Sequence, residues 1–288
     1  MKKTALGFLF FVLLFSAIAT VPSANAWGPN THVYLLKDIL TVLPTTNEAY
    51  KFWQIHPDAM LCGLMFPDVT VIYYYLDFKQ YQSTHSWNWL ERLWATAGTD
   101  RERAFVWGVA FHLVQDSISH NEYIPKKIRE TNVLNGIIHP LVEASVEASY
   151  VMFETASAME AVDEFLPFVQ RTLGKDMTRE AHLFRDIIRS GSFYEEGYAP
   201  PKDDLKWQIY RGLLNFAQAR IDSSDHLPYL TRAREFSVAY AQLRLPTLYD
   251  PSGAVSLGQA DSELTFSSVL IYLVLGTVII VVIWRFRR

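Results

Sequence analysis

The fold is decided by residues 103–120, which read RAFVWGVAFHLVQDSISH. Apolar side chains recur there at the spacing of an α-helix, and His112, Asp116 and His120 follow one another at intervals of four. Burying two imidazoles and a carboxylate on an apolar face is costly unless the groups are paired or bind a cation. The stretch therefore predicts a buried helix whose polar groups hold a metal ion.

Three other stretches show the periodicity of helices, namely residues 133–159, 201–221 and 228–243. Alternating runs of strand length are scarce, and residues 69–75 come nearest to one. We therefore predict an all-α fold. Residues 27–245 are expected to form a single helical domain, which is long enough to bury a substantial core.

The first residues of the chain have the three parts of a secretory signal peptide. Two lysines follow the initial methionine, a long apolar stretch comes next, and the small residues Ala24 and Ala26 form a cleavage motif. An uncleaved N-terminal anchor is the alternative, but the small residues favour cleavage. We expect residues 1–26 to be removed, which would leave Trp27 with a free α-amine.

The other end of the chain carries a predicted transmembrane helix. Residues 266–284 contain no charged side chain and are long enough to cross a hydrocarbon core of about 30 Å. Residues 246–265 are rich in turn formers and are interpreted as a linker. The arginines of the tail, residues 285–288, belong on the cytoplasmic side. A buried core helix is the alternative, but it would have little left to pack against.

These two ends together predict a single-pass protein of the cell membrane whose catalytic body is extracytoplasmic, either periplasmic or extracellular. The net charge of -4 is spread over a chain with no basic run outside its tail. This composition lacks the electrostatic footprint of a nucleic-acid-binding protein, so no nucleic-acid partner is expected. The single cysteine, Cys62, excludes an intramolecular disulfide.

Histidines and acidic residues gather at helical spacing in the first half of the chain. His139 and Glu143 repeat on the next predicted helix the interval of four that separates His112, Asp116 and His120. One such pair alone is more often a surface hydrogen bond or a core histidine than a pair of ligands. The combination indicates zinc, because imidazole nitrogens and carboxylate oxygens both suit that ion.

With these residues the chain resembles the zinc-dependent phospholipase C family, whose fold is shared with the single-strand-specific nucleases. In that family an N-terminal tryptophan binds zinc through its amine and carbonyl, and an ordered series of His, Asp and Glu ligands follows. Nine positions match in order: Trp27, His32, Asp68, His85, His112, Asp116, His120, His139 and Glu143. The resemblance covers roughly residues 27–147 and implies a single helical domain of this type that binds up to three zinc ions.

The resemblance also implies how these residues divide among the ions. One zinc would be held by Asp68, His85, His112 and Asp116. A second would be held by Trp27, His32 and the other oxygen of Asp116. A third would take His120, His139 and Glu143. Asp116 would then bridge two ions, which a carboxylate can do because it has two oxygens.

Two departures from the family pattern concern the substrate. His120 follows Asp116 by four residues, as in the N-terminal domain of glycosylphosphatidylinositol-specific phospholipase D, whereas the Bacillus-type phospholipases and the nucleases have an interval of six. Asn30 and Val69 stand where Bacillus-type enzymes have a glutamate and a tyrosine of the choline pocket. Choline specificity is therefore not implied.

The leading hypothesis is a membrane-tethered phosphodiesterase that cleaves a phospholipid or a related phosphoester with a metal-activated water. Asp68 is the candidate that orients or deprotonates this water. The aromatic segments 73–75 and 87–89 would either contact acyl chains or, as is commoner, pack in the core. A nuclease or nucleotidase is one alternative. The net negative charge of the chain and the predicted membrane anchor argue against it. A non-catalytic zinc-binding membrane protein is the other, against which the complete ligand set stands.

Overall fold

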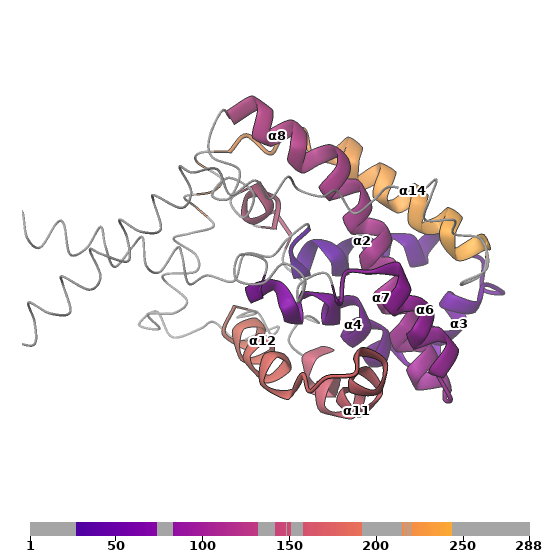
Figure 1. Cartoon of the computed structure of the whole chain (residues 1–288). Coiled ribbons are helices and arrows are strands. Elements are labelled where there is room, and N and C mark those ends of the chain that lie inside the picture. Colours follow the sequence, from indigo (N-terminus) through magenta and orange to yellow (C-terminus); the bar gives the residue numbers. More distant parts are fainter. Residues whose placement is uncertain are drawn as a thin grey trace, which may run out of the picture.

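The structure, a computed structural model, describes residues 27–73, 83–131, 142–147, 149–150, 158–191, 215, 217, 219 and 221–243. Every element in this part of the chain is a helix (Figure 1). This confirms the all-α prediction for the residues described.

The α-helices are α2 (Pro29–Val42), α3 (Glu48–Ile55), α4 (Pro57–Met65), α6 (Trp87–Thr96), α7 (Asp100–Ile118), α8 (Ile124–Thr131), α11 (Val162–Leu173), α12 (Thr178–Gly191) and α14 (Leu227–Leu243). The short segments of other helix types are the 3-10 helices η1 (Phe66–Tyr73) and η3 (Met159–Ala161) and the π-helix η2 (Ser119–Tyr123). Residues 142–147 are also helical.

The central element of the described fold is α7, which contacts α3, α4, α6 and α14. It begins with a capping box, in which the Thr99 hydroxyl accepts from the Glu102 amide and the Glu102 carboxylate accepts from the Thr99 amide, both at 3.1 Å. From Ala104 to Ile118 every side chain of α7 is buried, as expected for a helix surrounded by others. In Figure 1, α7 continues through η2 into α8.

The helices α4 and α7 approach each other so closely that neither tolerates a side chain at the contact. A Cβ atom at Gly63 would lie 1.9 Å from the carbonyl oxygen of Phe105 on α7. A Cβ atom at Gly108 would lie 2.0 Å from the carbonyl oxygen of Met60 on α4. Glycine is required at both positions because the obstacle is helix backbone rather than a flexible side chain.

Two of the predicted helices agree with the structure. The stretch 103–120 lies in α7 and, from Ser119 onward, in the π-helix, which the sequence did not predict. The stretch 228–243 is α14, which packs against both α7 and α2 through small buried side chains such as Ala233 and Ala241. Of the stretch 201–221, only a few residues are described, so that prediction stays open.

A continuous helix over residues 133–159 is wrong, because a turn interrupts it after residue 147. The amide of Ser149 donates to the carbonyl of Val146 at 2.8 Å, which closes the turn. Tyr150 is not helical, and its hydroxyl lies 2.7 Å from Nε2 of His226. The helical periodicity of the sequence therefore does not produce helix at residues 149 and 150. The strand-like run 69–75 is also not a strand where it is described, since residues 69–73 belong to η1.

The described part of the chain contains no helix that is both long and apolar enough to span a bilayer. The predicted signal peptide, residues 1–26, the predicted linker, residues 246–265, the predicted span, residues 266–284, and the tail, residues 285–288, all lie outside the described residues. The single-domain boundary at residues 27–245 likewise stays a prediction.

The aromatic segment 87–89 packs in the core. Trp89 is fully buried, and its indole N–H donates to the Thr172 hydroxyl at 3.0 Å. Trp87 is partly buried and lies against Tyr240 with ring centroids 6.0 Å apart. The core interpretation of this segment is therefore confirmed, whereas the side chains of segment 73–75 lie outside the described residues.

The close approach of α4 and α7 predicts that Gly108→Ala lowers the free energy of unfolding by about 1–3 kcal/mol, as overpacking of a dense interior does. The loss is expected although alanine is intrinsically the better helix former by about 1 kcal/mol. Chemical denaturation measures it. Gly98→Ala is the matched control, because a Cβ atom there would meet its nearest neighbour at 3.6 Å, an ordinary contact. Equal stability of the Gly108 variant and the parent would contradict the packing argument.

Candidate metal centre

Six of the predicted ligands come together from five segments of the chain. His32 lies in the first turn of α2, Asp68 lies in η1, and His85 lies just before α6. α7 supplies His112 and Asp116, and His120 lies in η2. All are buried except His120, whose side chain is 9 % exposed. Residues far apart in sequence therefore form one cluster.

Asp116 is the centre of this cluster. Its Oδ1 lies 3.1 Å from Nε2 of His32. Its Oδ2 lies 3.1 Å from Nε2 of His112, 3.8 Å from Nε2 of His85 and 3.9 Å from Nε2 of His120. The two oxygens of one carboxylate thus face different histidines, as a carboxylate that bridges two ions must do.

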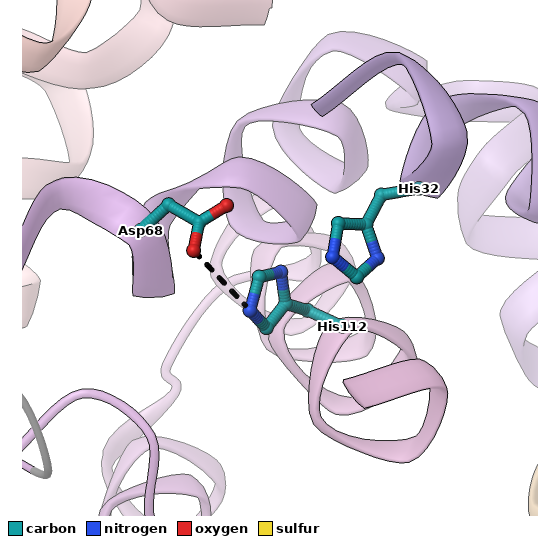
Figure 2. Close-up of side chains that lie close together, drawn as sticks. All are labelled: His32, Asp68 and His112. Carbon is teal, nitrogen blue, oxygen red and sulfur yellow. Dashed lines mark ion pairs between the residues drawn. The ribbon is translucent and has the colours of Figure 1, made fainter. Parts of the chain in front are cut away.

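Asp68 lies on η1 and approaches two of these histidines, of which Figure 2 shows His112. Its Oδ1 lies 3.5 Å from Nε2 of His85 and 3.8 Å from Nε2 of His112. The adjacent carbonyl of Pro67 accepts a hydrogen bond of 2.8 Å from the Thr84 hydroxyl. Thr84 therefore ties the segment of His85 to that of Asp68, which explains why two segments more than a dozen residues apart meet at the cluster.

Hydrogen bonds orient two of the imidazole rings toward Asp116. Nδ1 of His112 donates to the carbonyl oxygen of Leu64 at 2.8 Å, which leaves Nε2 facing the cluster. Nδ1 of His32 lies 2.6 Å from Oε1 of Gln115, which has the same effect on its Nε2. The two rings also stack with centroids 4.2 Å apart. Such bonds on the far nitrogen fix the tautomer and direction of a ligating histidine.

The polar atoms at the centre fit a bound cation. Both oxygens of Asp116 and Oδ2 of Asp68 are buried and accept no well-aligned hydrogen bond. Imidazole nitrogens do lie close to the two Asp116 oxygens. Buried carboxylate oxygens left in this condition are costly unless something else compensates their charge. Among the described residues, two sets of three donors lie within 4.8 Å of one another: His32, Asp68 and His112, and His85, His112 and Asp116. Nitrogen and carboxylate donors in this mixture are those that zinc prefers.

The protonation states of Asp116 and His120 also suit a metal. Burial alone would raise the pKa of Asp116, but its interactions with His112 and His32 hold this pKa well below the ordinary value, so it is ionised. Burial lowers the pKa of His120 to about 4, against the opposing charge of Asp116, so its imidazole is neutral near pH 7. An ionised carboxylate and a neutral imidazole are the forms that bind metal.

Glu143 belongs to the same charged neighbourhood. It lies in the helical residues 142–147 and is 1 % exposed. Burial, followed by the negative charges of Asp116 and Asp68, raises its pKa well above the ordinary value. An added cation would reverse this effect and favour the ionised carboxylate.

The remaining predicted ligands are placed less completely. Trp27 is buried next to the first turn of α2, and its indole stacks on Tyr123 with ring centroids 5.3 Å apart. His139 lies outside the described residues, so the third group of ligands stays a prediction. Two other histidines have partners outside the cluster: His182 pairs with Asp163 at 2.6 Å, and Nδ1 of His226 lies close to the carbonyl oxygen of Ser223.

Comparison with known proteins agrees with this geometry. The sequence model of one family, described as zinc dependent phospholipase C, matches residues 31–179, more than half of the chain. The chain belongs to the zinc-dependent phospholipase C family. This confirms the resemblance drawn from the motifs and supports zinc as the ion, without deciding the number of ions. Searches of the curated proteins and of the solved structures gave no match.

Sequence reasoning missed the groups that orient the ligands in this phospholipase C family member. Gln115 carries a signal, since it follows His112 by three residues and so lies near the same face of the helix. The Leu64 carbonyl carries none, because any residue can supply a backbone acceptor.

The bond between His32 and Gln115 predicts that Gln115→Leu weakens zinc binding by about 10- to 100-fold, the usual effect of losing such an outer partner. Leucine has a similar size but accepts no hydrogen bond, so the His32 ring loses its fixed direction. Competition with a chelator measures the zinc affinity. Gln170→Leu is the control, because Gln170 bonds to Asp176 and Thr178 rather than to the cluster. A folded Gln115 variant with the parent's zinc affinity would show that this bond does not orient His32.

Proposed function

We propose that the protein is a zinc-dependent phosphodiesterase that hydrolyses a phospholipid or a related phosphoester in the manner of a phospholipase C. The observation that carries the proposal is the buried Asp116 carboxylate, whose two oxygens face four imidazoles without hydrogen bonds of proper geometry. Membership of the zinc-dependent phospholipase C family gives this cluster its chemical class.

The residues that would hold zinc are those of the cluster, with Asp116 shared between two ions and Glu143 and His139 completing a third group. Zinc bound there would polarise the phosphoryl oxygens and activate a water for attack. A structural zinc needs only four protein ligands. A donor set larger than four therefore favours a catalytic role over a purely structural one.

Asp68 is the residue that we assign to the attacking water. Its Oδ1 faces His85 and His112, whereas its buried Oδ2 has no hydrogen-bond donor in the described structure. That oxygen is available to accept a proton from a water and to hold the water in line with phosphorus. We propose that Asp68 thereby both contacts metal and orients the nucleophile.

We further propose that this domain acts beside a membrane, outside the cytoplasm. The proposal rests on the signal-peptide pattern of residues 1–26 and on the uncharged span at residues 266–284 with its arginine tail. A domain tethered in this way meets lipid substrates at high local concentration. A phospholipid is therefore favoured over a soluble phosphodiester.

The function is tested by hydrolysis of a panel of phospholipids in mixed vesicles beside single-stranded DNA, with zinc counted in the same preparations. We expect turnover of a phospholipid and two or more zinc ions per chain. Asp116→Asn should abolish turnover and remove about two ions, because the amide lacks the charge and the second donor oxygen of a bridging carboxylate.

Asp163→Asn is the matched control, since Asp163 pairs with His182 and Arg185 away from the cluster. It should retain both the zinc and the turnover of the parent. Turnover of DNA alone would replace the lipid proposal with a nuclease. Full zinc content in the Asp116 variant would show that Asp116 does not bridge two ions. If the parent chain binds zinc but turns over no phosphoester, the protein binds zinc without being a hydrolase.

The proposed role of Trp27 makes zinc binding depend on processing. A free amine and the carbonyl of residue 27 can chelate zinc, whereas a peptide nitrogen is a poor donor because its lone pair is delocalised. Protein that retains a few residues before Trp27 should therefore bind one zinc fewer and turn over little substrate, while staying folded. Metal analysis and hydrolysis of the extended and the processed forms measure this. Trp27→Ala keeps both backbone donors, so its loss of zinc and of turnover should be smaller than that of the extended form. Equal zinc content in the extended and processed forms would contradict the ligand role of residue 27.

A further inference from the structure

Glu147 makes a set of hydrogen bonds to a part of the chain far away in sequence. Its Oε1 accepts from the Asn30 amide at 2.8 Å. Its Oε2 accepts from the Thr31 amide at 3.1 Å and from the Thr31 hydroxyl at 2.9 Å. The Glu147 side chain is buried, so these bonds are shielded from water. The Glu147 carboxylate therefore supplies acceptors for the backbone amides of Asn30 and Thr31 in the first turn of α2.

This arrangement replaces a cap that the sequence of α2 does not supply. The N-cap residue is Gly28, which has no side chain, and the first turn carries no acidic residue. In α7, by contrast, the local pair Thr99 and Glu102 performs the same task. The start of α2 is thus held in place by a distant residue.

Gly28 is fitted to this carboxylate. Its backbone angles, φ -66 and ψ 166, are open to any residue, so the backbone does not demand glycine. A Cβ atom at residue 28 would nevertheless lie 2.3 Å from Oε2 of Glu147. Glycine therefore leaves room for the Glu147 carboxylate, which a side chain at residue 28 would displace.

The turn closed by Glu147 contains His32 and directly follows Trp27, the two N-terminal residues predicted to bind zinc. The amide of His32 donates to the carbonyl of Gly28 at 3.0 Å, so His32 belongs to the capped turn. Trp27 directly precedes Gly28. The direction of His32 toward Asp116 therefore depends on where this turn sits.

We propose that Glu147 is a positioning residue, which holds residues 27–32 against the metal cluster by closing the first turn of α2. The inference rests on the zinc site of the proposed function. Glu147 touches neither zinc nor substrate in this role; it acts through Gly28 and Thr31, and its loss releases the donors of residues 27 and 32 together.

The test uses the processed full-length chain and zinc itself as the probe. E147A is expected to bind one zinc fewer than the parent at a free zinc level that saturates the parent, with an affinity at that site lower by about 10- to 100-fold. E102A is the matched control, since it removes a cap of the same kind from α7. It should lower the melting temperature and leave the zinc count unchanged.

Gly28→Ala provides a second route to the same contact. Alone, it should push the carboxylate out of place and lower the zinc count as E147A does. Combined with E147A, it should add no further loss, because the side chain that it strikes is gone. If E147A does not fold, Gly28→Ala alone is compared with E102A. Mass spectrometry of the Gly28→Ala variant confirms that its N-terminus is processed as in the parent.

Zinc counts equal to the parent's in E147A and in Gly28→Ala would overturn the inference, as would an equal loss of zinc in E102A. Additive losses in the double variant would also overturn it. The result is separable from the proposed function. If the parent chain binds zinc but cleaves no phosphoester, the proposed function is contradicted and the positioning role is not. If E147A keeps normal turnover and full zinc, only the positioning role is contradicted.

Discussion

The cluster depends on how closely the backbones of α4 and α7 approach each other at Gly63 and Gly108. A Cβ atom at either position would overlap a carbonyl of the partner helix. Because the backbones touch, the Leu64 carbonyl lies within 2.8 Å of the His112 ring and fixes its direction. α4 also leads directly into η1, which carries Asp68. Two small residues therefore bring a carboxylate and an imidazole from different helices close together, and larger residues would have separated them.

The cluster places three acidic side chains in the buried interior. Asp68, Asp116 and Glu143 are each 2 % exposed or less, and the ion-pair partners described for Asp68 and Asp116 are histidines. An isolated buried carboxylate either takes up a proton or finds a cation. Imidazoles provide part of this compensation, as the low pKa of Asp116 shows. Metal ions bound at the cluster would supply the rest, and folding of the protein would then be coupled to metal binding.

Sequence reasoning succeeded where a pattern is local and failed where a partner is distant. The intervals between His112, Asp116 and His120 follow from helix geometry, so the α7 ligands could be read directly. The break after Glu147 could not, because the helical periodicity of the sequence continues past it; in the folded chain Tyr150 contacts His226 and Tyr34 there. The π-helix at His120 left no clear mark in the residue pattern. Gln115 and Glu147 each lie one turn from a predicted ligand, yet only the folded chain shows what they bond to.

The bond from Thr31 to Glu147 joins positions that are 116 residues apart, and this separation sets an order of events during synthesis. A ribosome adds roughly 5–20 residues per second, so the start of α2 waits roughly 6–23 seconds for the residue that closes its first turn. For the first part of this interval the N-terminal histidine has neither its cap nor the carboxylate at residue 116 that it will face, and it gains its cap only after that carboxylate has been made. The complete cluster can therefore form only after the helices have come together. Binding of an ion that needs the N-terminal histidine would then be a late event in the folding of the chain.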